Sequence, residues 1–244
     1  MRIADTPAPV EVQLYRVSLR DDARAIATAL RQLSHEEHAR AGRFRTAPDH
    51  RRYVLTRARL REIVGRYLDL SPRAVPIVID AQGKPGVDAA ARDGVHFNCS
   101  HAGDLGVIAL ASAPVGIDVE QLRPLDDVLD LADAQFAEDE RATIRRARSD
   151  ARTALFLQCW TSKEAVLKAT GAGIANGMAH FSVALDRERQ HLGLPDLARL
   201  DRPTTLEARA AHVALLTLAR IAPEPGYVGA VAVAALEINL RWKT

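Results

Sequence analysis

The sequence has few cysteines, no long apolar stretch and almost no excess of charge of either sign. Its two cysteines, Cys99 and Cys159, stand in no CxxC or Cys/His pattern, which excludes a disulfide framework and a zinc site. The longest apolar run near the carboxyl end, residues 228–236, is far shorter than the ~18 residues that a membrane helix needs. Residues 1–9 lack the basic start and the apolar core of a secretory signal. We therefore expect a soluble cytoplasmic protein with no membrane partner.

The positive charge is concentrated in one short stretch, although the net charge is only +2. The stretch holds these arginines: Arg40, Arg43, Arg45, Arg51, Arg52, Arg57, Arg59 and Arg61. Such a run is most often a solvated helix face, and the alternative is a surface that binds phosphate. We expect no nucleic-acid partner, because acidic residues elsewhere in the chain nearly cancel this patch.

Helical and strand patterns follow one another along the whole chain. With 244 residues, 48% apolar and 26% charged, the chain can bury a core as one large domain or two small ones. Helices are predicted over 22–31, 34–43, 49–70, 125–148 and 150–170, the second beginning at a capping box of Ser34 and Glu37 and the last ending at Gly171. Strands are predicted over 10–17, 75–79, 96–99, 106–111, 115–119, 181–185, 213–219 and 227–236. The strands 106–111 and 115–119 are expected to form a hairpin.

The two halves of the chain are similar to each other. In each, a long helix is followed by a short apolar strand that ends in aspartate, at residues 75–80 and again at 181–186. Residues 105–110 likewise have a counterpart in residues 227–232. This repetition suggests two α+β halves, and a cleft between packed halves is a favoured place for a ligand.

The segment VGIDVE places two carboxylates on one side of a strand. Side chains alternate along a strand, so Asp118 and Glu120 share a face while Ile117 and Val119 take the other. Neighbouring carboxylates that both stay ionised are offered to water or to a cation, and magnesium prefers such oxygen ligands together with phosphate. An exposed acidic strand end without a ligand is the alternative.

The segment WTSKEAVLK places a tryptophan, a carboxylate and an ammonium on one stripe of a helix. Trp160, Glu164 and Lys168 are spaced four residues apart, which puts them on the same face. A carboxylate and an ammonium on an inward face need partners. The alternative is a surface ion pair worth ~0.3 kcal/mol beside a tryptophan in the core.

Two turns carry further candidates. The segment FNCSH ends a strand with a hydroxyl and an imidazole, Ser100 and His101, although a single histidine is more often structural than catalytic. The segment GKP combines a tight turn with Lys84 and Pro85, where the backbone can approach a flat ligand.

The order of these segments resembles that of a known enzyme family. A basic helix, GKP, FNxSH, VGIDVE and WTSKEAVLK follow one another as in the 4'-phosphopantetheinyl transferases of the surfactin-synthetase-activating type, the two-halved branch of that superfamily. The resemblance covers residues 40–186, and the repeated pattern extends it to most of the chain. It implies an α+β fold of two similar halves in a pseudo-two-fold arrangement, residues 1–114 and 115–244.

The resemblance also implies a set of site residues. A magnesium ion, with manganese as the alternative, would be held by Asp118, Glu120 and Glu164 on the pyrophosphate of coenzyme A. The residues implied to bind coenzyme A are Arg40 and Arg52 at the 3'-phosphate, Lys84 and Pro85 at the adenine, Ser100 and His101 at phosphate, and Lys163 and Lys168 at the pyrophosphate. The implied catalytic residues are Glu164 as the base, Lys168 and His101. Glu140 is a further implied acidic position, whereas Glu37 departs from a family pattern that is often basic there.

The implied reaction is transfer of 4'-phosphopantetheine from coenzyme A to a serine of an apo acyl or peptidyl carrier protein, with release of adenosine 3',5'-bisphosphate. Attack on phosphorus is catalysed mainly by positioning and by charge compensation, which these carboxylates and lysines can supply. Two fused halves imply that a monomer contains a complete site. The alternative functions are a non-catalytic coenzyme A or nucleotide-binding protein and a different metal-dependent phosphotransferase or hydrolase.

Overall fold

The computed structural model describes residues 8–20, 22–80, 83–88, 90, 94–171, 178–193 and 215–244. The elements of the first half are β1 (Val10–Ser18), α1 (Ala23–Leu30), α2 (His35–Ala41), α3 (Ala47–Leu68), a 3₁₀ turn (Pro72–Ala74), β2 (Ile77–Ile79), β3 (Pro85–Val87), β4 (His96–Ala102) and β5 (Leu105–Ala111). Those of the second half are β6 (Val115–Gln121), α4 (Val128–Gln135), α5 (Glu138–Arg146), α6 (Ser149–Thr170), a 3₁₀ turn (Met178–His180), β7 (Arg189–Gly193), β8 (Leu215–Ile221), β9 (Tyr227–Val233) and β10 (Ile238–Lys243). No helix within these described ranges is long and apolar enough to cross a membrane.

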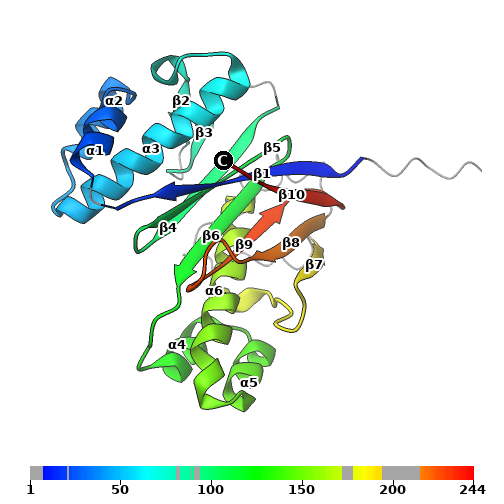
Figure 1. Ribbon diagram of the computed structural model, residues 1–244. Coiled ribbons are helices and arrows are strands. Elements are labelled where there is room, and N and C mark those ends of the chain that lie inside the picture. The colour runs from blue at the N-terminus through cyan, green and yellow to red at the C-terminus, as the bar shows by residue number, and fades with distance from the viewer. Residues whose placement is uncertain are drawn as a thin grey trace, which may run out of the picture.

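Two four-stranded sheets pack face to face, with helices on both outer sides (Figure 1). The first has the strand order β10-β1-β5-β4 and is covered by α1, α2 and α3. The second has the order β6-β9-β8-β7 and is covered by α6, against which α4 and α5 pack. Each half is therefore a sheet with helices on its outer face.

Strand alternation divides the core into layers. In β5, Ile108 and Leu110 point to the helices of the first half, whereas Val107 and Ala109 point to the other sheet. All seven residues of β5 are buried, because both faces of this inner strand are covered. The counterpart of β5 predicted at residues 227–232 lies in β9, which is the inner strand between β6 and β8.

The last strand joins the sheet of the first half. β10 pairs in parallel with β1, from Val10 opposite Ile238 to Tyr15 opposite Lys243. A parallel pair needs a long connection, and here almost the whole chain lies between the two strands. The two halves therefore share a sheet as well as the core between the sheets.

Most local predictions are confirmed by the structure. The first strand and the first three helices form where expected, and Ser34 with Glu37 makes both hydrogen bonds of the capping box. Gly171 ends α6 in the left-handed conformation (φ 75°), which suits a residue without Cβ. Of the strand predicted at 213–219, residues 213 and 214 lie outside the described residues and the rest is in β8.

The predicted hairpin of 106–111 and 115–119 is wrong. β5 pairs with β1 on one side and with β4 on the other, so both of its edges are occupied. β6 pairs instead with β9 in the second sheet. Residues 112–114 therefore carry the chain from one sheet to the other, which a local pattern of two strands and a turn does not reveal.

Two other segments differ from their predictions. The helix predicted over 125–148 is divided into α4 and α5 by the extended backbone of Phe136 and Ala137. Residues 181–185 form no strand. Two of their backbone N–H groups form hydrogen bonds with side chains and not with a neighbouring strand. The N–H groups of Val183 and Ala184 donate to Glu140 Oε1 (2.7 Å) and Gln190 Oε1 (2.8 Å), respectively. The strands β3, β7 and β10 have no counterpart in the predictions.

A single glycine lets α6 lie directly on β6. A Cβ at Gly116 would stand 2.9 Å from the carbonyl carbon of Lys168 and closer still to the Ala165 carbonyl oxygen and the Ala169 nitrogen. Real Cβ atoms do not approach backbone this closely, so any other residue would push the helix away. The helix and the strand are thereby held at a distance that only glycine permits.

We expect Gly116→Ala to destabilise the protein by ~1–3 kcal/mol, because the added methyl group overpacks the contact between β6 and α6. Gly86→Ala is the control, since a Cβ at Gly86 has nothing within 4 Å, and it should stay within ~1 kcal/mol of the wild type. Urea unfolding of both variants measures the difference. Equal stability of the two variants would contradict the close contact.

Candidate functional site

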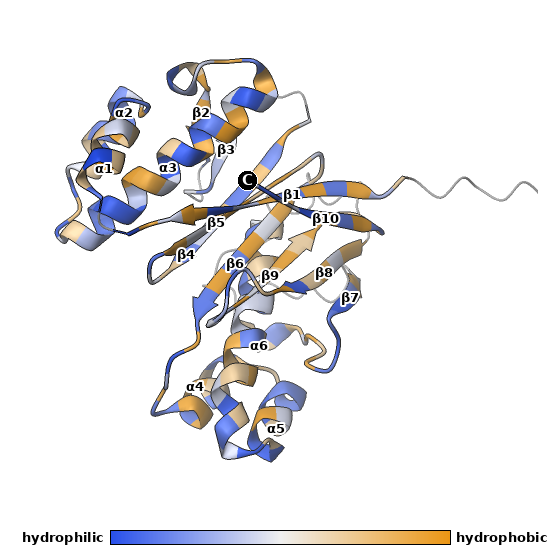
Figure 2. Ribbon diagram, viewed as in Figure 1, coloured by the Kyte–Doolittle hydropathy of each residue, from blue (hydrophilic) through white to orange (hydrophobic). Residues whose placement is uncertain are grey.

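Predicted acidic and basic residues meet where the carboxyl ends of β4 and β6 lie against α6. Ser100 is on β4, Asp118 and Glu120 are on β6, and Glu164 and Lys168 are on α6. Figure 2 shows β6 changing from apolar to hydrophilic toward this end. The residues therefore gather at the junction of the two sheets.

The two faces of β6 have the properties that the sequence predicts. Ile117 and Val119 are buried in the core between the sheets. Asp118 is on the opposite face, where its carboxylate meets Lys168 of α6. Because Gly116 is on this same face, the helix approaches closely enough for the contact to form.

The ammonium of Lys168 joins three elements. Its Nζ lies 2.7 Å from Asp118 Oδ1, 3.3 Å from Ser100 Oγ and 3.4 Å from the carbonyl oxygen of Ile117. The Ser100 hydroxyl also donates to Asp118 Oδ1 (2.7 Å). Lys168 thus pairs with Asp118 of another element, and the ion pair along α6 considered as the alternative is not the contact it makes.

Glu164 is buried one turn before Lys168 on the same stripe. Further along this stripe, Trp160 stacks on Phe156 with 6.1 Å between ring centroids. Burial raises the pKa of Glu164; Lys168 opposes this rise, and the negative charges of Asp118 and Glu120 add to it. The pKa of Glu120 is raised by its own burial and by Asp118, while Arg123 and Lys168 lower it. The charge of Asp118 therefore raises the pKa of both glutamates, and the charge of Glu120 raises that of Glu164.

Two carboxylate oxygens at this junction have no partner. Asp118 Oδ2 and Glu164 Oε1 are buried and accept no hydrogen bond. Buried polar atoms are normally satisfied, so such orphans call for an explanation. A hard divalent cation is the ligand that anionic oxygens of this kind take, and the residues present fit magnesium.

No three His, Cys, Asp or Glu side chains in the part of the chain that the structure describes already stand together as a finished metal site. The fit to magnesium consequently rests on the two orphaned oxygens and on the electrostatic coupling of Glu120 with Asp118 and Glu164. Phosphate oxygens commonly complete such a site, since magnesium uses few protein ligands.

His101 and Arg52 form the basic side of the junction. Arg52 Nε donates to the carbonyl oxygen of Gly103 in the turn after β4 (3.1 Å), and its Nη1 bonds Asp49 (3.3 Å). The packing around His101 lowers its pKa, and the charges of Arg52 and Lys168 lower it further. The positive charges of Arg52 and Lys168 thus disfavour protonation of the His101 imidazole.

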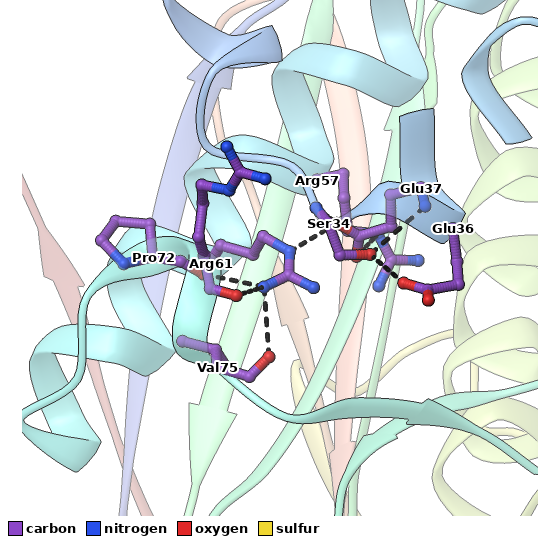
Figure 3. A network of polar contacts seen from close by, with 8 residues as sticks. Ser34, Glu36, Glu37, Arg57, Arg61, Pro72 and Val75 are labelled. Atoms are coloured by element: carbon purple, nitrogen blue, oxygen red, sulfur yellow. Dashed lines mark hydrogen bonds and ion pairs between the residues drawn. The ribbon is translucent and has the colours of Figure 1, made fainter. Parts of the chain in front are cut away.

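Part of the basic stretch is structural, and Glu37 is the reason. Glu37 accepts a hydrogen bond from Arg61 and lies 3.6 Å from Arg57, and both arginines are buried (Figure 3). Arg61 Nη1 also donates to the carbonyl oxygens of Pro72 (2.7 Å) and Val75 (3.1 Å). Glu37 thus supplies the counter-charge of a buried network.

The remaining predicted coenzyme A residues come from α2, from the turn before β3 and from the first residue of β3. The exposed Arg40 lies over the ring of Tyr53, 5.6 Å from its centroid. Strands β2 and β3 form an antiparallel pair, and Lys84 lies in the turn between them, next to Pro85. Its ammonium donates to the carbonyl oxygen of Lys168 near the end of α6. Lys84 therefore reaches from the first half to the second.

Asn98 is a site residue that the sequence predictions omit. Its side chain accepts a hydrogen bond from the N–H of Ile117, which precedes Asp118 (3.0 Å). The available signal was its place two residues before Ser100, on the same face of a strand. A buried amide next to a hydroxyl that binds Asp118 belongs to the same junction.

Comparison with known proteins assigns the chain to a family. A model of the 4'-phosphopantetheinyl transferase superfamily matches residues 114–221, and a model of the 4'-phosphopantetheinyl transferase N-terminal region matches residues 20–113. The 4'-phosphopantetheinyl transferase HetI of Nostoc sp. is 37% identical over 72% of this chain and 74% of its own length. The chain belongs to the 4'-phosphopantetheinyl transferase family.

Two further relatives are also named 4'-phosphopantetheinyl transferases. The 4'-phosphopantetheinyl transferase psf-1 of Bacillus pumilus is 36% identical over 67% of this chain and 69% of its own. The 4'-phosphopantetheinyl transferase Sfp of Bacillus subtilis is 29% identical over 67% and 72%. The predicted family, the α+β fold of two similar halves and the classification as an enzyme are confirmed.

Lys163 of the transferase lies apart from the other predicted pyrophosphate ligands. It is fully buried, and its Nζ forms an ion pair with Glu140 Oε1 (2.8 Å) and donates to the carbonyl oxygens of Met178 (2.7 Å) and Phe181. Glu140 also accepts from the N–H of Ala137 (2.9 Å). Burial raises the pKa of Glu140, and Lys163 is the main opposing influence. The pair joins α6 to α5 and to residues 178–183.

We expect Lys163→Met to destabilise the transferase by ~3–5 kcal/mol, because it leaves the carboxylate of Glu140 buried without its counter-charge. The double variant K163M/E140Q should recover part of this loss, since a neutral amide needs no counter-charge. Arg148→Met is the control, as the Arg148–Asp150 pair is exposed and should be worth less than ~1 kcal/mol. Urea unfolding gives the energies; unchanged stability of K163M with a raised KM for coenzyme A would instead favour the pyrophosphate role.

Proposed function

We propose that this chain transfers 4'-phosphopantetheine from coenzyme A to the serine of an apo acyl or peptidyl carrier protein, with release of adenosine 3',5'-bisphosphate. Family membership supports the reaction. The observation that carries the assignment of the site is the junction of Asp118, Glu164, Ser100 and Lys168, where two buried carboxylate oxygens have no partner.

We propose Asp118, Glu120 and Glu164 as the ligands of a magnesium ion. When bound, the ion would offset negative charge on the pyrophosphate oxygens of coenzyme A. The support is the pair of orphaned oxygens together with the oxygen preference of magnesium.

The proposed task of the basic residues is to bind and orient the phosphates. Ser100, near the end of β4, accepts a hydrogen bond from Lys168, so a phosphate there would meet a hydroxyl and an ammonium. His101, the next residue of β4, is exposed and would hold phosphate through its imidazole. Lys168 would also stabilise the departing adenosine bisphosphate, because compensation of developing charge is the main source of catalysis in phosphoryl transfer. Arg52 and Arg40 remain the proposed 3'-phosphate ligands, and Lys84 with Pro85 the proposed lining of the adenine pocket.

The proposed base is Glu164. A neutral serine hydroxyl is a weak nucleophile, and a carboxylate next to it can accept its proton. Glu140 is not part of this proposal, since its carboxylate is engaged by Lys163 and two backbone N–H groups.

We further propose that the protein acts as a monomer in the cytoplasm. The two halves share a sheet and a core within one chain, and the residues of the junction come from both. Cys99 and Cys159 are free thiols, which suits a reducing compartment.

Incubation with magnesium, fluorescent coenzyme A and an apo carrier protein should label the carrier serine on a denaturing gel. A chelator should abolish the labelling and added magnesium should restore it, because the carboxylates need a cation to bind the pyrophosphate. A carrier whose serine is replaced by alanine is the control. No label on fatty-acid or peptide-synthetase carriers by the folded protein, or release of product without a carrier, would contradict the proposed reaction.

Glu164→Gln should reduce kcat by roughly 10²–10⁴-fold while coenzyme A affinity changes little, because the amide oxygen can still ligate the cation but the amide cannot accept the serine proton. A matched control is E138Q, at an exposed carboxylate of α5, which should keep wild-type rates. Single-turnover labelling and equilibrium binding of coenzyme A separate the two effects. An unchanged kcat would remove Glu164 from the role of base.

A further inference from the structure

The outer edge of β6 is satisfied by side chains. Among the described strands, β6 pairs only with β9, and Ile117 stands opposite Val231 in that pair. The N–H of Ile117 donates to Asn98 Oδ1 (3.0 Å), and its carbonyl oxygen accepts from Lys168 Nζ (3.4 Å). Both backbone groups therefore point away from β9, as in a non-hydrogen-bonded pair of an antiparallel ladder. Asn98 and Lys168 stand where another strand would.

The hydrogen bond from the Ile117 N–H to Asn98 requires an acceptor atom on the side chain. Because the backbone N–H of Ile117 is a donor, the atom that faces it must be the side-chain oxygen of Asn98 and not its NH₂ group. Asn98 is 6% exposed, and its place in β4 is set by pairing opposite Ala109 of β5. A buried N–H that loses its acceptor destabilises the fold. A shift of β6 along β4 would break this hydrogen bond and therefore lower the stability of the protein.

The same strand holds the next residue of β6. Ser100, two residues after Asn98 and on the same face of β4, donates to Asp118 Oδ1 (2.7 Å). Asn98 and Ser100 thus bind two consecutive residues of β6, and Lys168 contacts both of these residues. A displacement of Ile117 would move Asp118 relative to Ser100 and Lys168.

We propose that Asn98 is a positioning residue of the transferase: its side-chain oxygen holds the Ile117 N–H in place of a neighbouring strand and thereby sets Asp118 for cation binding. The inference rests on the proposed function, in which Asp118 is a metal ligand. Asn98 acts through the backbone of β6. Groups that orient metal ligands typically change metal affinity by about 10–100-fold when removed.

The test is the affinity of the coenzyme-free protein for Mn²⁺, titrated by electron paramagnetic resonance of the free ion. Asn98→Ala should weaken binding by roughly tenfold or more, because Asp118 is no longer fixed. Asn98→Asp keeps an acceptor oxygen at the same place and should stay closer to the wild type. If N98A does not fold, Asn98→Ser, with a shorter acceptor, should show an intermediate loss.

The control is Thr217→Val. Thr217 on β8 is also buried, and its single hydroxyl proton is shared between the carbonyl oxygens of Ala235 (2.7 Å) and Leu236 (2.9 Å). Its loss should lower stability in urea without changing Mn²⁺ affinity. If N98A also loses stability only, and binds Mn²⁺ like the wild type, Asn98 is merely structural and the proposal is overturned.

The wild-type protein separates this proposal from the proposed function. If it binds Mn²⁺ but transfers no label to any carrier, the proposed reaction fails while the comparison of N98A with T217V still decides the role of Asn98. If it binds no Mn²⁺ either alone or with coenzyme A, whose phosphates can complete the site, the proposed metal site is overturned, and the positioning role falls with it.

Discussion

The close contact between β6 and the backbone of α6 is the constraint on which the rest of this structure depends. Gly116 leaves no side chain between them, so the helix lies nearer to the sheet than any other residue would allow. At this distance Lys168 reaches Asp118 directly. The same approach buries Glu164 on the stripe that faces the strand. If a side chain at position 116 pushed the helix away, Lys168 would lie too far from Asp118 for their ion pair to form.

The site exists because two sheets meet at their edges without pairing. β4 ends one sheet and β6 ends the other, and the polar groups between them are satisfied by Asn98, Ser100 and Lys168. A continuous ladder would have used the backbone groups of Ile117 for strand pairing. Side-chain bonds instead leave room for carboxylates at the junction, and two of their oxygens remain without partners.

Charge in this protein has two separate uses. Arg57, Arg61 and Glu37 form a buried network that joins α2 to α3, and Lys163 with Glu140 joins α6 to α5. Buried ions of this kind hold elements together only when each has its counter-charge and its hydrogen bonds. Lys168 instead lies at the junction, where its ammonium pairs with Asp118 and contacts Ser100. Residue type alone does not distinguish these uses.

The sequence by itself determined the positions of most helices, the two faces of β6 and the stripe of α6, because periods of 2 and 3.6 residues follow from local backbone geometry. Motif order also identified the family. Only the tertiary structure decided that β6 pairs with β9, that Lys163 is enclosed by Glu140, and that Asn98 bonds Ile117. The physical reason is the same in each case: these contacts join residues distant in the chain, and their energies depend on burial and on partners that local patterns do not contain.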